Sequence, residues 1–151
     1  MTLSTKSDPD YQNVRARNRL KGNLGENIAC KYLMERGFDI SDRNYRKPWG
    51  ELDIIAVKDS VIHFVEVKSV AVRGLPSLRL EKGSIHDGLP AHSPEENVHA
   101  FKLKQIRKMI RTYFSEREVE CEREFRFHVI CVYLNMDTRL ARVRWIENII
   151  I

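Results

Sequence analysis

Two acidic residues and a lysine stand at positions where a pair of strands would bring them together. Asp53 lies in the stretch 50–57, and Glu66 and Lys68 lie in the stretch 61–68. Both stretches consist largely of aliphatic and β-branched residues, so each predicts a strand. Side chains alternate along a strand, and Glu66 and Lys68 would therefore share one face. Two carboxylates beside a lysine are suited to bind a cation and to act on a charged substrate.

The register of this hairpin depends on the length of its loop. If residues 59–60 form a two-residue loop, a common length, Asp53 lies directly opposite Glu66 and Glu51 lies opposite Lys68. A three-residue loop would instead put the two acids on different faces. Directly opposite residues have Cβ atoms roughly 5 Å apart, where like charges are destabilising. A divalent cation would explain the pair, because hard cations bind carboxylate oxygens.

These residues match what a metal-dependent phosphodiesterase needs. Asp53, Glu66 and the backbone carbonyl of Val67 are suited to ligate a divalent ion, which lowers the pKa of the attacking water. Lys68 would place a positive charge near the phosphate. The alternative is a charge cluster on a solvent face, but the same face is apolar further along the strands. Glu51 has two interpretations, a surface partner of Lys68 or a group that supports the site.

A helix is predicted before this hairpin. Asn23 and Glu26 have the spacing of a capping box, apolar residues then recur at helical spacing, and Gly37 fits a C-terminal stop. The pattern predicts a helix over 24–36. The cap alone explains an acid at Glu26, although the same residue is also a candidate acid of the site.

The rest of the chain adds one helix and three strands. Strands are predicted over 38–45, 125–134 and 142–146, and a helix over 94–115. With the hairpin, the order is α-β-β-β-α-β-β. This order predicts a single α/β domain with a mixed β-sheet flanked by helices, because a hairpin precedes a helical crossover.

Two segments do not fit this pattern. Residues 1–21 are polar and without periodicity, and they predict a flexible basic arm in front of a domain that spans 22–151. Residues 69–93 contain several Gly and Pro residues and predict a long loop.

The composition suits a polyanionic partner without requiring one. The formal net charge is +5, and basic residues cluster in the arm, before the hairpin and on the second helix. A solvated face is the alternative explanation for each cluster. The sequence has neither an apolar stretch of about 20 residues nor an apolar signal region, so we expect a cytoplasmic protein. Cys30 and Cys131 fall within predicted elements and are expected to be buried thiols.

The hairpin carries a resemblance to a known family. Asp53 followed by Glu66-x-Lys68, after a helix with Glu26, resembles the PD-(D/E)xK nuclease signature of the restriction-endonuclease-like fold. More narrowly, residues 22–150 resemble the YraN-like family of bacterial proteins in that superfamily. The matching segments include Gly25-Glu26-x-x-Ala29, residues 50–56, residues 64–68, Lys104-Gln105 and Phe125-Arg126-Phe127. His128 stands where the family usually has an acid.

The resemblance implies a function. It implies that Glu26 is a site acid, that Mg²⁺ is the metal, with Mn²⁺ as a substitute, and that nucleic acid is the substrate. DNA is expected, with branched or damaged structures as targets by analogy. The family order also suggests Gln105 near the site. Basic side chains expected to contact nucleic acid are Arg46, Lys47, Lys104 and Arg107.

Two other classes stay open at this point. The chain would also fit a non-catalytic nucleic-acid-binding module that keeps the nuclease fold, or a protein-interaction module whose long loop docks a partner. A homodimer is compatible with the resemblance, because enzymes of branched DNA must cut two strands.

Overall fold

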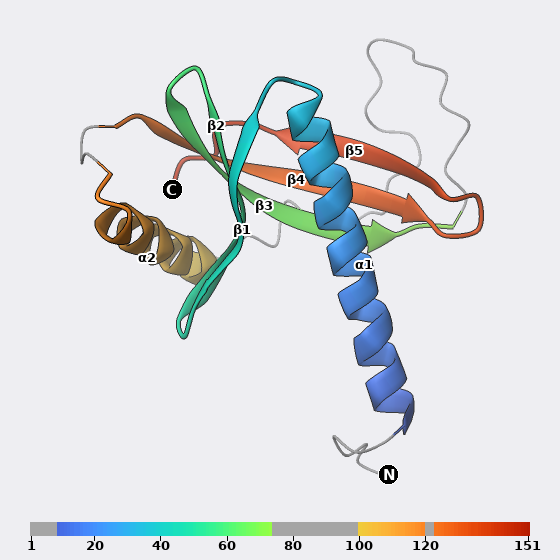
Figure 1. Cartoon of the computed structure of the whole chain (residues 1–151). Helices are drawn as coiled ribbons and strands as arrows, with labels where there is room; N and C mark the ends of the chain where they lie inside the picture. Colours follow the sequence, from blue (N-terminus) through green and yellow to red (C-terminus); the bar gives the residue numbers. More distant parts are fainter. Residues whose placement is uncertain (1–8, 74–99, 120–122) are drawn as a thin grey trace.

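A five-stranded sheet with a helix on each face forms the core of the computed structural model (Figure 1). The structure describes residues 9–73, 100–119 and 123–151. The elements are α1 (Pro9–Met34), β1 (Asp39–Lys47), β2 (Gly50–Lys58), β3 (Val61–Ala71), α2 (Ala100–Glu116), β4 (Phe125–Asn135) and β5 (Leu140–Ile146). This single α/β domain with a mixed sheet confirms the predicted order of elements.

The strands lie in the sheet in the order in which they occur along the chain. β3 and β4 run parallel, and the other neighbouring strands run antiparallel. A parallel pair requires a crossover connection, and α2 lies in the segment between β3 and β4.

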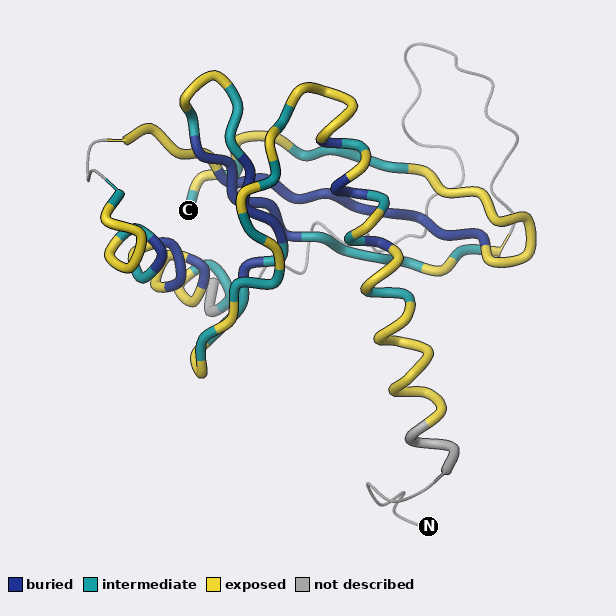
Figure 2. The backbone as a smooth tube through the Cα atoms, in the orientation of Figure 1, coloured by how far each residue is buried: buried dark blue, intermediate teal, exposed yellow. Residues whose placement is uncertain are grey.

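Each helix buries one face of the sheet. On one face Ala29 and Leu33 of α1 pack with residues such as Val65, and on the other Met109 of α2 packs with residues such as Phe64. Figure 2 shows the buried middle of the strands between the two helices. Cys30 and Cys131 belong to these clusters, and the prediction that both are buried is confirmed.

Helix α1 is much longer than predicted. It begins at Pro9 instead of residue 24, so the predicted arm is helical from that point, and residues 13–20 lie exposed along it (Figure 2). The sequence misled because this half lacks an apolar stripe, although arginine, lysine and leucine are good helix formers. The capping-box interpretation of Glu26 is therefore wrong, since that residue lies inside the helix.

The predicted end of this helix is correct. Gly37 has a φ of 81°, and its N–H donates to the Met34 carbonyl at 3.0 Å. The Phe38 N–H donates to the Leu33 carbonyl at 3.2 Å, which completes a Schellman motif.

The β2–β3 hairpin has the two-residue loop. Asp59 and Ser60 have φ values of 50° and 64°, as in a type I′ turn, and Lys58 pairs with Val61. The predicted register holds along the described ladder, as far as the pair Ile54–Val65.

Beyond that pair the two strands separate. β2 continues beside β1 as far as Gly50, whereas β3 continues beside β4 as far as Ala71. Asp53 and Glu66 are the first residues past the fork, so they border it without forming a ladder pair. The predicted loop at 69–93 therefore starts too early, and residues 74–99, including the expected start of the second helix, lie outside the described residues.

Within the described part of the chain, neither helix combines the length and the hydropathy that spanning a membrane requires.

Candidate active site

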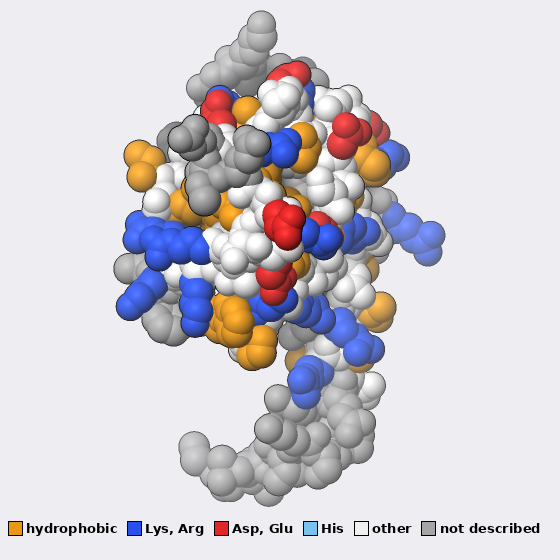
Figure 3. All heavy atoms as spheres, turned by 60° about the vertical axis from the view of Figure 1, so that its left-hand side comes forward, with side chains coloured by type: hydrophobic (Ala, Val, Ile, Leu, Met, Phe, Trp, Pro, Cys, Tyr) orange, Lys and Arg blue, Asp and Glu red, His pale blue; other side chains and the backbone are white. Residues whose placement is uncertain are grey.

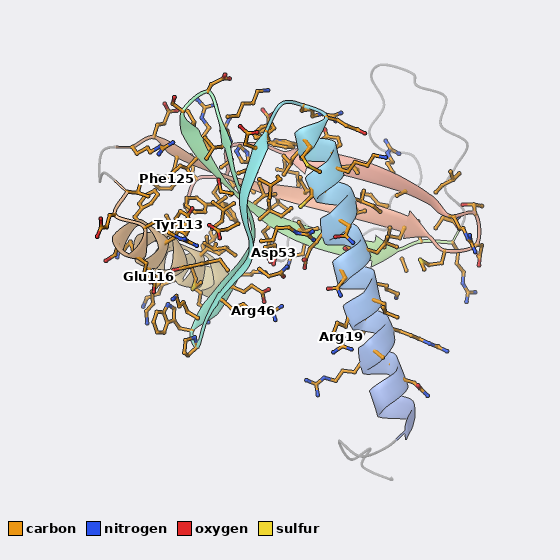
Figure 4. All side chains as sticks on the ribbon, in the orientation of Figure 1. Arg19, Arg46, Asp53, Tyr113, Glu116 and Phe125 are labelled. Atoms are coloured by element: carbon orange, nitrogen blue, oxygen red, sulfur yellow. The ribbon has the colours of Figure 1, made fainter. Side chains whose placement is uncertain are left out.

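Asp53 lies at the base of the fork between β2 and β3. Its Oδ2 accepts a hydrogen bond from the Val67 N–H at 2.7 Å. Because β3 no longer pairs with β2 at this point, the carboxylate takes the place of a carbonyl of β2. Figure 4 shows Asp53 between the two helices, with Arg46 nearer the tip of the β1–β2 hairpin. The prediction placed Val67 in the site through its carbonyl, whereas the observed contact uses its N–H.

Glu66 is almost fully buried, with 8% of its surface exposed. Its Oε1 accepts a hydrogen bond from Lys68 Nζ at 3.1 Å and another from Lys102 Nζ. Lys68 stands two residues further along β3, as the alternation of the strand predicted. Lys102 lies in the first turn of α2. The site therefore combines residues of the strand fork with a residue of the helix that lies between β3 and β4 in the chain.

Burial and crowding of charge alter the acidity of this cluster. Burial, and after it the charge of Glu66, raise the pKa of Asp53 to about 7, against the opposing effect of the Val67 hydrogen bond. Burial lowers the pKa of Lys102, but the hydrogen bond to Glu66 and the charges of Glu66 and Asp53 act in the opposite direction, and the pKa is raised. A carboxyl group with a raised pKa beside the ammonium group of a lysine is typical of a functional site.

Glu26 approaches the fork from α1. Its Oε2 accepts a hydrogen bond from Asn44 Nδ2 at 2.9 Å, and Arg43 NH2 lies 3.8 Å away. Asn44 has a φ of 51°, a conformation that asparagine tolerates better than most residues. The negative charge of Glu26 contributes to the raised pKa of Asp53, so the two acids share one electrostatic environment.

A glycine allows α1 to pack closely against β3 beside the site. A Cβ at Gly25 would overlap Ser69 Oγ and would lie 2.9 Å from the Cβ of that serine. Ser69 immediately follows Lys68 on β3. The close approach of helix to strand at Gly25 therefore positions Glu26 at the fork.

The remaining predicted residues have other partners than this cluster. The charge of Glu51 contributes to the raised pKa of Asp53. Glu51 itself faces Arg46 on β1 and pairs with its Nε at 2.8 Å, so its interpretation as a partner of Lys68 is wrong. The reason is that β2 has already separated from β3 at that point.

The predicted basic residues have other positions. Lys47 pairs with Glu116 at the end of α2. The exposed residues of α2 include Lys104, Gln105 and Arg107.

Sequence reasoning missed Lys102. The family order pointed to Gln105, three residues further along α2. A usable signal existed, because Lys102 precedes Ile106, Met109, Ile110 and Tyr113, which are buried against the sheet, at helical spacing. A residue one turn before that stripe faces the same side of the helix.

The donor set suits a hard divalent cation in its chemistry. Asp53 and Glu66 bring carboxylate oxygens into one buried place, where their mutual repulsion favours a positive partner. In the described segments, however, no three His, Cys, Asp or Glu side chains are grouped to hold a metal ion. An ion would thus depend on these two carboxylates together with backbone groups or water.

Comparison with known proteins identifies the family. The sequence model described as uncharacterised protein family UPF0102 matches residues 25–132. The chain belongs to this family. It is the YraN-like family that the motifs indicated.

Curated UPF0102 proteins of bacteria are similar over most of the chain. A UPF0102 protein of Campylobacter fetus is 31% identical over 131 residues, which cover 86% of this chain and 93% of the relative. A UPF0102 protein of Helicobacter pylori is 37% identical over 102 residues, which cover 68% of this chain and 73% of the relative.

The UPF0102 match covers the whole candidate site. The matched segment begins at Gly25, the glycine that seats α1, and ends within β4. It contains Glu26, Asp53, Glu66 and both lysines. The exposed first half of α1 and all of β5 lie outside it.

Proposed function

We propose that this UPF0102 protein is a metal-dependent nuclease that hydrolyses phosphodiester bonds, with DNA as the expected substrate. The observation that carries the proposal is the pair of carboxylates at the strand fork, the half-buried Asp53 and the buried Glu66, with the ammonium groups of two lysines on Glu66. A structural ion pair would need one cation for each carboxylate. Here both cations crowd onto a single oxygen, and Asp53 has a raised pKa.

Each residue has a role in this proposal. Asp53 and Glu66 would hold Mg²⁺, which when bound supplies an activated water and a counter-charge for the phosphate. The Val67 N–H fixes the orientation of the Asp53 carboxylate. Lys68 keeps a positive charge beside the reacting phosphate. Glu26, held by Asn44, maintains the negative field that favours a cation at the fork.

The basic surface is suited to the backbone of a nucleic acid. Exposed Arg15, Arg17 and Arg19 follow one another along the first half of α1. On the face shown in Figure 3, Lys and Arg side chains spread over the lower half and continue onto α1. Lys104 and Arg107 add positive charge on α2. Such contacts give affinity without reading sequence, and they weaken with salt.

The test is cleavage of labelled single-stranded, duplex, flapped and four-way-junction DNA with Mg²⁺, with Mn²⁺ and with EDTA. Asp53→Asn keeps the size of the side chain and removes its charge, and Asp59→Asn makes the same change in the exposed turn of the same hairpin. We expect metal-dependent cleavage that falls at least about 100-fold in Asp53→Asn and stays unchanged in Asp59→Asn. Equal cleavage by both variants would exclude the proposed site.

One observation favours a second candidate, a nucleic-acid-binding module without turnover. Lys68 and Lys102 both pair with Glu66, so this carboxylate has positively charged partners within the protein itself. Salt-sensitive binding of the same DNA substrates, with no cleavage under any metal condition, would support this alternative.

A further inference from the structure

We propose that Lys102 is a second active-site lysine that alternates between two partners. In the free protein it is the counter-ion of Glu66, and it turns to the substrate phosphate when a divalent ion takes that carboxylate. This inference rests on the proposed nuclease function and adds a residue to it.

The contacts at Glu66 carry the inference. Lys68 and Lys102 both donate to Oε1 of Glu66, although a single ammonium group would balance the charge of this carboxylate. The Glu66 side chain is 10% exposed, whereas the side chains of the two lysines are 32% and 33% exposed. Both ammonium groups thus stand between a buried acid and the solvent from which a substrate would arrive.

Lys102 is the lysine that is free to change partner. Lys68 shares a rigid strand with Glu66 and pairs with Cys131 of β4, so its ammonium stays close to the acid. Lys102 reaches the acid from another element through a long, flexible side chain. When Asp53 and Glu66 both hold an ion, the carboxylate has fewer lone pairs for donors, and Lys102 has the more distant anchor.

The orientation of α2 directs the Lys102 side chain toward the fork, whichever group it binds there. Ile106, Met109 and Ile110 are buried against the sheet and fix the rotation of α2. Lys102 lies one turn before them on the same side, whereas Lys108 is exposed and its Nζ lies 4.7 Å from the centroid of the Trp49 ring. A phosphate at the fork would therefore meet the ammonium of Lys102 and not that of Lys108. Lys108 provides the matched control.

The experiment separates two effects that should have opposite signs. The affinity of the full chain for Mn²⁺ is measured by calorimetry without nucleic acid, and single-turnover cleavage is measured on the best DNA substrate. We expect Lys102→Met to bind Mn²⁺ several-fold tighter, because it removes a competing cation from Glu66. We expect the same variant to cleave at least about tenfold more slowly, because it loses a cation at the phosphate.

Two further variants define the controls. Lys108→Met removes the same charge from the same helix and should leave Mn²⁺ affinity and the single-turnover rate at saturating DNA unchanged. Lys102→Arg keeps the charge and should recover most of the cleavage rate. Loss of structure would weaken metal binding and cleavage together, so tighter binding with slower cleavage distinguishes the proposed role from a merely structural one.

The outcomes also separate this inference from the proposed function. If Lys102→Met binds Mn²⁺ no tighter than the wild type, or if neither binds it, the counter-ion role is overturned. If that variant cleaves at the wild-type rate while Asp53→Asn is inactive, the phosphate role is overturned and the nuclease stands. If the wild type cleaves no substrate, the nuclease proposal and the phosphate role fail, and tighter Mn²⁺ binding would then support the counter-ion role alone.

Discussion

Two polar clusters lie at opposite ends of the β2–β3 hairpin, and they differ in charge and in exposure to solvent. The fork cluster consists of Asp53, Glu66, Lys68 and Lys102. The histidine cluster consists of His63 and His128, near the turn of the hairpin, where the two residues are 7% and 2% exposed. Both clusters lie on the same sheet, so the fold does not explain why one is charged and the other is neutral.

Hydrogen bonds within the protein connect the two histidines to each other and to the backbone. The Asn148 N–H donates to His128 Nδ1 at 3.2 Å, and His128 Nε2 lies 2.8 Å from His63 Nδ1. Because Nδ1 of His128 accepts, its Nε2 carries the proton and donates to His63. Burial lowers the pKa of both rings, to about 4 for His128, where the neighbouring His63 adds to the effect. The pair thus remains neutral and ties β3, β4 and the segment after β5 together.

The difference between the clusters indicates their roles. Neutral groups with matched donors and acceptors stabilise a fold, whereas crowded charges with shifted pKa values are costly and are typical of functional sites. His128, which directly follows the matching segment Phe125-Arg126-Phe127, lies in the neutral cluster and not at the fork.

The largest expected effect is on the packing of α1 against β3 beside the fork. Gly25→Ala places a Cβ against Ser69, whose own Cβ cannot rotate away, so helix or strand must shift. We expect a loss of about 3 kcal/mol in the free energy of unfolding, typical of overpacking, measured by urea denaturation. Cleavage per folded molecule should also fall, because Glu26 moves with the helix.

Gly22→Ala is the matched control. It changes a glycine of the same helix that has open space around its Cα, so it should stabilise the protein by about 1 kcal/mol through helix propensity. If both alanine variants were stabilising, the close contact between α1 and β3 would be wrong.

The next effect is an acid-induced loss of stability from the histidine cluster. The pKa of His128 is lower in the folded protein than in the unfolded chain, so the unfolded chain binds more protons between pH 6.5 and about 4. Stability from this group is complete above pH 6.5 and is lost as the pH falls toward 4. We expect a loss of about 2 kcal/mol by pH 4.5, measured by urea denaturation at several pH values.

His128→Gln should remove most of this pH dependence, whatever its effect on stability at pH 7. An unchanged slope between pH 6.5 and 4.5 in that variant would assign the acid sensitivity to other groups.

Several features of the fork cluster and of α1 could be predicted from sequence, because they depend on local rules. The two-residue turn and the alternation of β3 placed Asp53, Glu66 and Lys68 together, and Gly37 ended α1 where its permissive φ is used. Contacts between distant elements could not be predicted this way. The reach of Lys102 to Glu66 depends on how α2 crosses the sheet, and spacing within one element does not specify that.

The fork itself shows the same limit. Strand propensity continued through both arms of the hairpin and predicted that pairing would extend to Glu51 and Lys68. The separation of β2 from β3 depends instead on which neighbour each strand finds further along, β1 for one and β4 for the other. Competition among strands for partners is a tertiary effect, and it opened the site between the acids.

The smallest expected effect is a gain in stability at the fork. Asp53 has a raised pKa in the folded protein, so folding is favoured while this group is protonated and is weakened as the pH rises from about 4 through about 7. This slope is opposite in sign to that of the histidine cluster. Asp53→Asn removes the charge, and we expect it to stabilise the protein by about 1 kcal/mol at pH 8 and by less at pH 5, a modest value because the site is partly open to solvent.

Urea denaturation of the wild type and of Asp53→Asn at pH 5 and pH 8 would measure this gain, with Asp59→Asn as the control for an exposed acid. A variant that is inactive and yet more stable at pH 8 would mean that the protein keeps a destabilising charge at the fork because its function requires that charge. A variant that is less stable at both pH values would mean that the Asp53 carboxylate, through Val67, mainly holds the strand fork together, and the contrast between the two clusters would then disappear.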